Sequence, residues 1–237
     1  MIHSSYKSIG PVEGGPQAVL AALSDYFEPG LLVLPTHTWA RVNTEQPVFE
    51  VENTPSNVGI LGELLRQEPG VIRTLHPTHS LAVKGAGAAE FASGEEQAAT
   101  PAPRSGCHGK IYDADSYVIF VGVPLTKNTI IHGAEEWAGI DNRLSAQPLP
   151  LVIRTADGTE IDRPMYSHWS ALGDQISETY DKLLDPLLTR GIAWRGTLGD
   201  AELIIAKVPE MIDYTLDLLA KEPDVFLDYE PIKPVLA

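Results

Sequence analysis

The segment from Thr129 to Glu136 carries the residue types that general-base chemistry needs. It reads Thr-Ile-Ile-His-Gly-Ala-Glu-Glu. If it is helical, Glu135 and Glu136 follow His132 by three and four residues and lie on the same helix face. A carboxylate next to an imidazole fixes the tautomer of the ring and raises its basicity. His132 is therefore a candidate general base, and the alternative is a solvated histidine–glutamate pair on a helix surface.

A second polar segment lies at the start of the chain. His3-Ser4-Ser5-Tyr6-Lys7-Ser8 is followed by Gly14-Gly15-Pro16, which runs into a predicted helix. Hydroxyl groups, a lysine and glycine amides near a helix start suit a phosphate or pyrophosphate group. The segment matches neither a Walker motif nor a dinucleotide-binding motif, so a plain polar connection between a strand and a helix is the alternative.

His76 and His79 have the spacing of a metal-ligand pair. Pro77 between them disfavours a helix that would present both rings to one ion. No second ligand pair with matching spacing is present, so we expect no metal. The rival hypothesis that uses this pair is a metal-dependent hydrolase with His76, His79, His37 and a carboxylate, and it predicts stoichiometric zinc in the purified protein.

Cys107 is followed directly by His108, which suggests a nucleophile with its base. Neighbours in sequence rarely form such a dyad, because catalytic geometry is normally assembled across the fold. We expect Cys107 to be a loop or packing residue and not an acyl carrier. The aromatic residues Trp39, Phe49 and Tyr112 could line a pocket, although aromatic side chains lie more often in the core.

The charge balance restricts the classes of ligand. Among 237 residues, 32 are acidic and 17 are basic, which gives a formal net charge of −15. A field of this sign repels phosphate backbones, which argues against nucleic-acid binding, and it favours a cationic ligand. The alternative is that the acidic surface only keeps the protein soluble. No apolar run approaches the ~20 residues of a membrane helix, no signal peptide is visible, and a single cysteine fits a cytoplasmic protein.

Apolar runs alternate with amphipathic segments, which predicts one α/β domain over residues 1–237. The run 117–123 is apolar throughout and is the predicted central strand. Two runs around an Asp-Gly turn predict an antiparallel hairpin over residues 149–165. Residues 36–54 read as a long loop, and residues 85–110 as a short helix near 87–91 and then a loop. The other predicted strands are 31–34, 71–75, 81–83, 192–197 and 201–206, and the other predicted helices are 17–27, 57–66, 126–138 (with a loop), 173–188 and 208–219.

Five segments, taken in order, resemble the antibiotic N-acetyltransferase family, the aminoglycoside 3-N-acetyltransferase group, which is distinct from the GNAT fold. They are HSSYKSIGPVEGGP (3–16), LPTHT (34–38), TPSNVG (54–59), RQEPGVIRTLHPTHS (66–80) and NTIIHGAE (128–135). The stretch 191–219, with Leu-Gly-Asp-Ala at 198–201, is also similar to that family. Each segment alone is weakly specific, whereas five in the right order make a specific match that covers nearly the whole chain. The resemblance implies a three-layer α/β sandwich with a central mixed sheet and a small antiparallel insertion.

The resemblance also implies roles for individual residues. His132 matches the catalytic histidine of the family, and Glu135 matches the acidic residue beside it. The Ser4–Ser5 loop and Ser80 match positions that line the coenzyme A cleft, and Glu50 falls where members often have an aspartate near the acceptor pocket. The expected cofactor-binding residues are His3, Ser4, Ser5, Lys7, Ser8, Gly14, Gly15, His76 and Ser80, and the expected acceptor-binding residues are Trp39, Glu50, Asn128 and Glu136.

The sequence departs from the family pattern in two places. Members usually carry a further helix and the start of the first strand before the His-Ser-Ser motif, so we expect an edge or floor of the coenzyme A cleft to be incomplete. Residues 104–112, RSGCHGKIY, replace a more usual Ser-Pro-Leu-type stretch. This replacement indicates a subgroup whose acceptor need not be an aminoglycoside.

The resemblance implies an aminoglycoside N(3)-acetyltransferase of the kind that confers antibiotic resistance, with acetyl-CoA as co-substrate and no metal. In the expected direct transfer, His132, held by Glu135, removes a proton from the acceptor amine as its nitrogen attacks the thioester carbonyl. The hydroxyl of Thr129 or a backbone N–H stabilises the oxyanion, and Glu50, Glu52 and Glu136 hold further ammonium groups of an aminoglycoside or related cationic amine. We expect a monomer or homodimer. A third hypothesis, besides the hydrolase, is a non-catalytic acidic amine-binding protein on the same fold.

Overall fold

A four-stranded mixed sheet forms one half of the central layer in the computed structural model, which describes residues 1–170 and 176–232. Its strand order is β1–β6–β10–β9. β1 (Ile2–Ser4) pairs in parallel with β6 (Tyr117–Val121), which holds the predicted central position. β10 (Ala201–Lys207) pairs antiparallel with both β6 and β9 (Ala193–Leu198).

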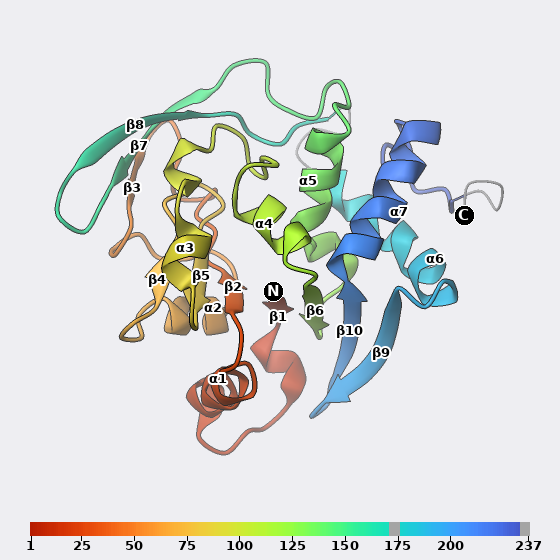
Figure 1. Cartoon of the computed structure of the whole chain (residues 1–237), viewed down its shortest axis with the longest axis horizontal. Helices are drawn as coiled ribbons and strands as arrows, with labels where there is room; N and C mark the ends of the chain where they lie inside the picture. Colours follow the sequence, from red (N-terminus) through yellow and green to blue (C-terminus); the bar gives the residue numbers. More distant parts are fainter. Residues whose placement is uncertain (171–175, 233–237) are drawn as a thin grey trace.

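A three-stranded antiparallel sheet continues this layer on the other side of β1. It consists of β2 (Leu32–Pro35), β5 (Leu81–Lys84) and β4 (Ile72–Arg73), with β5 in the middle. β2 packs beside β1, so the two sheets form one layer across the molecule (Figure 1). The layer is therefore mixed in strand direction, as expected from the sequence, but two sheets share it.

Helices cover both faces of this layer, which gives the three-layer α/β sandwich (Figure 1). On one face lie α1 (Gly15–Tyr26) and α2 (Ile60–Leu65), and on the other lie α3 (Ala88–Ala92), α4 (Cys107–Asp113), α5 (Ile130–Trp137) and α7 (Val208–Lys221). Short 3-10 helices occur at η1 (Tyr6–Ile9), η2 (Glu95–Gln97), η3 (Leu125–Lys127) and η4 (Ile176–Leu183), and α6 (Leu184–Thr189) follows η4.

The alternation of side chains along the strands explains why the central strands are apolar throughout. In β2, Val33 packs into the core under α3, α4, α5 and α7, whereas Leu32 and Leu34 pack into the core under α1 and α2. Phe120 and Val121 of β6 divide between the two cores in the same way. Successive strand residues point to opposite faces, so a strand covered on both faces needs apolar side chains at every position.

A third sheet stands apart from this layer. β7 (Leu149–Arg154) and β8 (Glu160–Met165) form the predicted hairpin with the expected bounds. β3 (Val48–Glu50) joins β7 in parallel, so the prediction of a loop throughout residues 36–54 is wrong at this strand. β3 has three residues and only Phe49 is buried, and its partner strand lies about a hundred residues later in the chain. A local pattern does not reveal such a pairing.

Two helices also differ from the prediction. α4 occupies residues predicted as loop, so the loop prediction is wrong there. Gly109 lies inside this helix, and glycine lowers helix propensity, which favoured the loop. That glycine is required, since a Cβ there would collide with the carbonyl oxygen of Arg104. In place of one helix over 173–188, η4 and α6 follow one another with Pro186 in the first turn of α6, and residues 171–175 lie outside the described part.

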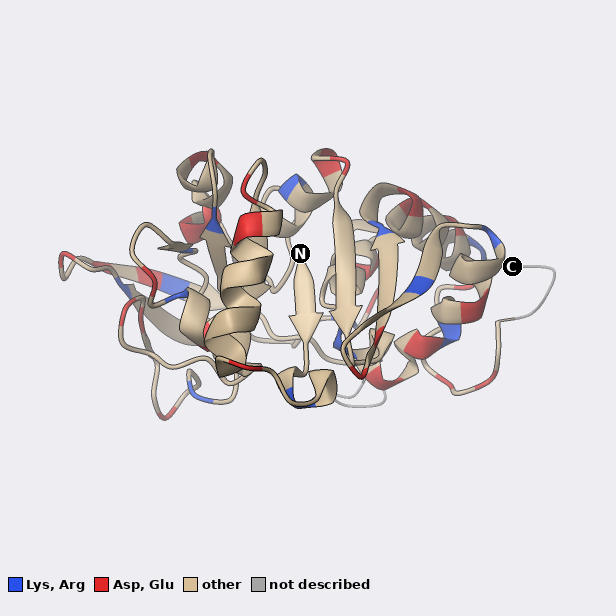
Figure 2. Ribbon diagram, turned by 90° about the horizontal axis from the view of Figure 1, so that it is seen from below, with Lys and Arg blue, Asp and Glu red and all other residues tan. Residues whose placement is uncertain are grey.

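Acidic side chains are distributed over the helices and loops of the exterior and outnumber the basic ones (Figure 2). Within the described residues, no helix combines the length and the apolar character needed to cross a membrane.

Substitution of a fully buried side chain of the central layer tests this packing. Leu81 of β5 has no exposed surface, so Leu81→Ala is expected to lower the free energy of unfolding by about 2–5 kcal/mol through lost burial and a residual cavity. Leu198→Ala, at a 36% exposed position of β9, is the matched control and should cost about 0.5 kcal/mol or less. Urea unfolding measures both, and equal losses would contradict the assigned core.

Candidate active site

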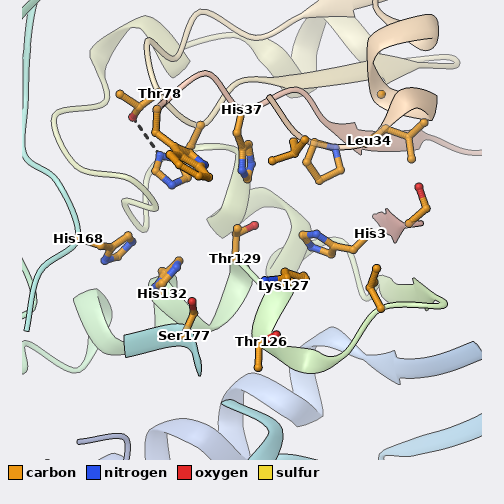
Figure 3. A pocket seen from close by; sticks show the side chains of 18 of the residues that line it. His3, Leu34, His37, Thr78, Thr126, Lys127, Thr129, His132, His168 and Ser177 are labelled. Carbon is orange, nitrogen blue, oxygen red and sulfur yellow. Dashed lines mark hydrogen bonds between the residues drawn. The ribbon is translucent and has the colours of Figure 1, made fainter. Parts of the chain in front are cut away.

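A cavity of about 630 Å³ opens around the C-terminal ends of β1, β2 and β6 (Figure 3). Strand ends of open α/β sheets are where ligand sites gather, and the volume lies within the range of small-molecule sites. His3 and Ser4 come from β1, His37 and Trp39 follow β2, and Thr129 and His132 follow β6. The remaining polar lining residues are Thr78, His79, Thr126, Lys127, Ser167, His168, Ser177 and Glu178.

His132 belongs to a buried chain of hydrogen bonds. Its Nδ1 lies 2.7 Å from Oη of Tyr180, which donates to Oε2 of Glu135 at 2.5 Å. Oε1 of Glu135 accepts from Nε of Arg143 at 2.8 Å. Nη2 of Arg143 in turn donates to the carbonyl oxygen of Pro223 at 2.9 Å. Glu135 therefore reaches His132 through Tyr180, not by the direct contact along the helix that the sequence suggested.

This chain determines which nitrogen of His132 is free. Tyr180 has one hydroxyl proton, and that proton goes to the carboxylate of Glu135. Tyr180 must then accept from His132, so the imidazole proton is on Nδ1. Nε2 then carries the lone pair, and His132 is one of the residues that line the cavity. An imidazole in this tautomer can accept a proton from a molecule in the cavity.

Burial controls the protonation of this hydrogen-bond chain. Desolvation, with a smaller contribution from His108, lowers the pKa of His132 to about 3, so the ring is neutral at pH 7. Burial raises the pKa of Glu135, while hydrogen bonds from Tyr180 and Arg143 act in the opposite direction. Burial and the nearby carboxylate of Glu135 raise the pKa of Tyr180 well above its usual value. A neutral base thus faces the cavity, and the charged partners lie behind it.

Five of the seven histidines of the chain are buried, and His79 and His168 are partly buried. Five of the seven line the cavity. The ring of His168 stacks on His132 with 3.6 Å between centroids, and the ring centroids of His79 lie 6.0 Å from His168 and 4.8 Å from His37. Burial lowers the pKa of every one of these rings. The cavity is consequently walled by neutral imidazoles.

Thr129 provides a hydroxyl next to the base. It occupies the N-cap position of α5, but its side chain makes no capping hydrogen bond. Its Oγ1 lies 3.4 Å from Nε2 of His108. Thr129 lines the cavity, so the structure brings together two of the three predicted catalytic residues there, and Glu135 lies behind them.

The N-terminal residues divide into two groups. His3 and Ser4 line the cavity, with the ring of His3 stacked on Phe120 at 5.4 Å. The other predicted cofactor-binding residues of this segment do not line it: Ser5, Lys7, Ser8, Gly14 and Gly15. The hydroxyl of Ser8 donates to that of Ser5 at 2.9 Å, and the two glycines adopt positive φ at the start of α1. They belong to the connection from β1 to α1, and their part in binding coenzyme A stays a prediction.

His76 and Ser80 form hydrogen bonds with backbone groups of neighbouring loops. Nδ1 of His76 accepts from the backbone N–H groups of Thr78 and His79, so Nε2 carries the proton and bonds the carbonyl oxygen of Thr100 at 3.1 Å. The hydroxyl of Ser80 donates to the carbonyl oxygen of Thr36 at 2.7 Å. Both residues hold together the loops that form one wall, and neither lines the cavity.

Of the four predicted acceptor-binding residues, only Trp39 lines the cavity, where it is 54% exposed. Glu50 pairs with Arg154 on the third sheet and borders a separate shallow hollow. Asn128 is buried and caps α5, since its Oδ1 accepts from the N–H of Ile130 at 3.2 Å. Neither side chain lines the cavity, and a role for either in acceptor binding stays a prediction.

Glu136 is likewise turned away from the cavity. Its carboxylate accepts from the hydroxyl of Thr100 at 2.6 Å and from the N–H of Ala102 at 2.9 Å. Burial raises the pKa of Glu136 to about 7. The expected acidic pocket is therefore not formed by Glu50 and Glu136, and within the described lining Glu178 is the one carboxylate and Lys127 the one ammonium group.

Three residues that no sequence pattern indicated complete the surroundings of the base: Tyr180, Arg143 and His168. Tyr180 lies 48 residues after His132 and in a 3-10 helix, so no local spacing connects the two. The three residues come from three segments that meet only in the folded chain. The concentration of histidines in the sequence was a usable signal, because all seven converge on this region.

Metal ligation is not supported by the arrangement of side chains. The described residues contain no group of three or more histidines, cysteines or carboxylates placed to hold a metal ion. Both ring nitrogens of His76 are engaged with backbone groups. Cys107 is buried, and burial raises the pKa of its thiol well above the usual value, so it is a packing residue, as expected.

The three-layer α/β fold brings a buried, hydrogen-bonded histidine of α5 to a cavity at the strand ends, which defines a candidate site for proton transfer. A family model described as aminoglycoside 3-N-acetyltransferase matches residues 1–220. The chain therefore belongs to the aminoglycoside 3-N-acetyltransferase family.

Individual relatives agree with this membership. Aminoglycoside N(3)-acetyltransferase VII of Streptomyces paromomycinus is 26% identical over 241 residues, which cover 90% of this chain and 82% of the relative. The structure of AAC-IIIb in a binary complex with CoASH matches with a TM-score of 0.80 and 22% identity, over 93% of this chain and 89% of that chain. A mutant of aminoglycoside acetyltransferase AAC(3)-IVa in complex with gentamicin matches with a TM-score of 0.79 and 22% identity, over 95% and 82% of the two chains.

The buried neutral histidines predict a loss of stability in mild acid. In the unfolded chain they bind protons at a pKa of about 6.5, whereas in the folded chain their pKa values are lower, so below pH 6.5 the unfolded state binds more protons. Each contributes a loss of up to about 1.4 kcal/mol per pH unit. The raised pKa values of Glu135 and Glu136 oppose part of this loss, because these carboxyls bind protons more readily in the folded chain. Urea unfolding between pH 7.5 and 5 should show a steep fall in the free energy of unfolding, and a flat profile would contradict neutral burial.

The hydroxyl of Tyr180 is expected to be needed for turnover. Tyr180→Phe removes the acceptor for Nδ1 of His132 and the donor to Glu135. We expect kcat for acetyl transfer to fall by about 10²-fold, within the range of general-base assistance, with the KM for acetyl-CoA nearly unchanged. The control is Tyr229→Phe, at an exposed position. An unchanged kcat in a folded Tyr180→Phe protein would contradict the role of this hydrogen-bond chain.

Proposed function

We propose that this chain transfers the acetyl group of acetyl-CoA to an amine of an aminoglycoside, with His132 as the general base. The observation that carries the proposal is the hydrogen-bond chain from Glu135 through Tyr180 to Nδ1 of His132, a residue that lines the 630 Å³ cavity. Family membership supports the reaction class. A relative's structure with CoASH and another with gentamicin support the two substrates.

Direct transfer fits the geometry of His132 and Thr129. The acceptor nitrogen attacks the thioester carbonyl, a carbon–nitrogen bond forms, and Nε2 of His132 takes the proton that leaves the nitrogen. The carbon–sulfur bond then breaks, and the proton passes from His132 to the departing thiolate. Tyr180 and Glu135 stabilise the transient imidazolium from behind. Thr129, one helical turn before His132, is the candidate donor to the oxyanion.

Acetyl-CoA, when bound, supplies the activated acetyl group, and the cavity has features that suit it. His3 has a buried Nε2 without a hydrogen-bond partner among the described residues, and Ser4 offers a hydroxyl on the same strand. Lys127 is exposed at the cavity and has no ion pair within the described part of the chain. These groups would hold the polar and anionic portions of the co-substrate. A cytoplasmic location and a monomeric or homodimeric assembly stay predictions.

The acceptor would meet neutral imidazoles and one carboxylate, Glu178. Long-range attraction for a polycation then comes from the net charge of −15 more than from an acidic pocket. Such steering weakens with ionic strength. A metal-dependent hydrolase finds no support in this arrangement, because His76 uses both ring nitrogens to bind the backbone. The non-catalytic hypothesis is decided by the presence or absence of turnover.

Replacement of the base tests the proposal. Acetyl-CoA turnover is measured as thiol release over a panel of aminoglycosides and polyamines, with the wild type and His132→Asn side by side. We expect turnover with at least one aminoglycoside and a loss of about 10²–10⁴-fold in the variant, since the base is removed and the fold kept. Asp217→Asn, exposed on α7, is the control with unchanged turnover.

The result has two opposing outcomes. Full activity in His132→Asn would contradict the role of His132. Absence of wild-type turnover across the panel, together with binding of the amines in calorimetry, would favour the non-catalytic hypothesis.

A further inference from the structure

The cavity contains a contact that the proposed reaction does not yet use. Oγ1 of Thr129 lies 3.4 Å from Nε2 of His108. Thr129 lines the cavity (Figure 3), whereas His108 lies behind it on α4 and is fully buried. His108 belongs to residues 104–112, the stretch that departs from the family pattern. The ring therefore reaches the site from a segment to which no function has been given.

The protonation of His108 decides what Thr129 can do. Burial lowers the pKa of His108 to about 3, so the ring is neutral and carries one proton. Its Nδ1 is buried and has no hydrogen-bond partner among the described residues. If the proton were on Nδ1, a buried donor would be left unpaired, whereas a proton on Nε2 leaves only an unpaired acceptor. Unpaired buried donors are the rarer case, so the proton belongs on Nε2.

This tautomer controls the direction of the hydroxyl proton of Thr129. Nε2–H of His108 donates to Oγ1, and a hydroxyl that accepts on one side keeps its own proton for another partner. The side chain of Thr129 caps no backbone group of α5. Within the described residues its hydroxyl has no other hydrogen bond, and the remaining direction is the cavity.

We propose that His108 is a positioning residue that turns the hydroxyl proton of Thr129 into the cavity, where Thr129 donates to the oxyanion formed on the thioester carbonyl. This inference rests on the proposed acetyl transfer and adds a residue to it. The hydrogen bond strengthens as negative charge develops on the carbonyl oxygen, because the donor is already oriented toward it. No proton is transferred by His108 or Thr129 in this step.

The position of His108 is fixed by its surroundings. Gly109, the next residue, packs directly against the carbonyl oxygen of Arg104, and the N–H of Cys107 donates to Oε2 of the buried Glu95 at 2.6 Å. These contacts anchor α4 on both sides of the ring. A rigidly held donor is what orientation of a hydroxyl group requires.

A double-mutant cycle tests the coupling. Thr129→Val, His108→Met and the double variant are compared in kcat for acetyl transfer to the best aminoglycoside of the panel. We expect Thr129→Val to lower kcat by about 10²-fold, and His108→Met to lower it by between about 10- and 100-fold, with KM for acetyl-CoA unchanged. In the Thr129→Val background, His108→Met should have no further effect, because the hydroxyl through which it acts is gone.

A conservative variant separates orientation from packing. His108→Gln carries an amide N–H that can donate to Oγ1 of Thr129, so it should recover most of the kcat that His108→Met loses. Additive losses in the cycle, or equal losses in the methionine and glutamine variants while both remain folded, would overturn the proposal.

The tautomer is measurable without turnover. Long-range ¹H–¹⁵N correlation spectra of the wild type should show His108 protonated on Nε2 at pH 7, and a proton on Nδ1 would overturn the proposal whatever the activity. If the wild type shows no turnover and His108 carries its proton on Nε2, the proposal of acetyl transfer is wrong, whereas the orientation of the Thr129 hydroxyl by His108 is supported. If turnover is present and the cycle is additive, only the role of His108 has failed.

Discussion

The buried carboxylate of Glu135 is the constraint around which the active site is organised. A charge without water requires partners, and here Arg143 supplies an ion pair at 2.8 Å while Tyr180 supplies a short hydrogen bond. Because Tyr180 gives its proton to Glu135, it can only accept from His132. The need of the Glu135 carboxylate for a hydrogen-bond donor thereby sets the tautomer of His132, with Tyr180 as the link between them. Removal of one member would leave the next with an unsatisfied group in a low-dielectric interior.

The same burial shapes the rest of the cavity. Seven histidines lie where desolvation keeps them uncharged, so the site presents hydrogen-bonding groups with little charge of its own. A neutral wall suits the reacting amine, which must lose its proton before it can attack. Among the described residues, Glu95 and Glu135 are the buried carboxylates, so most of the negative charge lies at the surface and acts at long range. The surface charge thus attracts the acceptor, and the neutral cavity is where the acceptor reacts.

The sequence was informative where local physics decides the structure. The strands of the central layer are apolar because both faces are covered, and the hairpin β7–β8 carries its Asp-Gly turn, so both were predictable. His132, Thr129 and His3 also lie at the cavity as expected. The strand β3 was not predictable, since its partner is distant, nor was Tyr180, whose role exists only through contacts across the fold. Glu136 lies on the same helix as His132 with the expected spacing. Its carboxylate nevertheless accepts a hydrogen bond from Thr100 on a neighbouring loop and does not line the cavity.

The protonation state of His132 is the most direct test of the account. Long-range ¹H–¹⁵N correlation spectra of the ¹⁵N-labelled wild type, recorded from pH 7.5 to 5.5, report the proton on each ring nitrogen. The account predicts a signal pattern with the proton on Nδ1 and a bare Nε2, and no titration near pH 6.5 because burial lowers the pKa of His132 to about 3. A proton on Nε2, or a ring that titrates near pH 6.5, would contradict the claim that Glu135 and Tyr180 hold His132 as a neutral base facing the cavity.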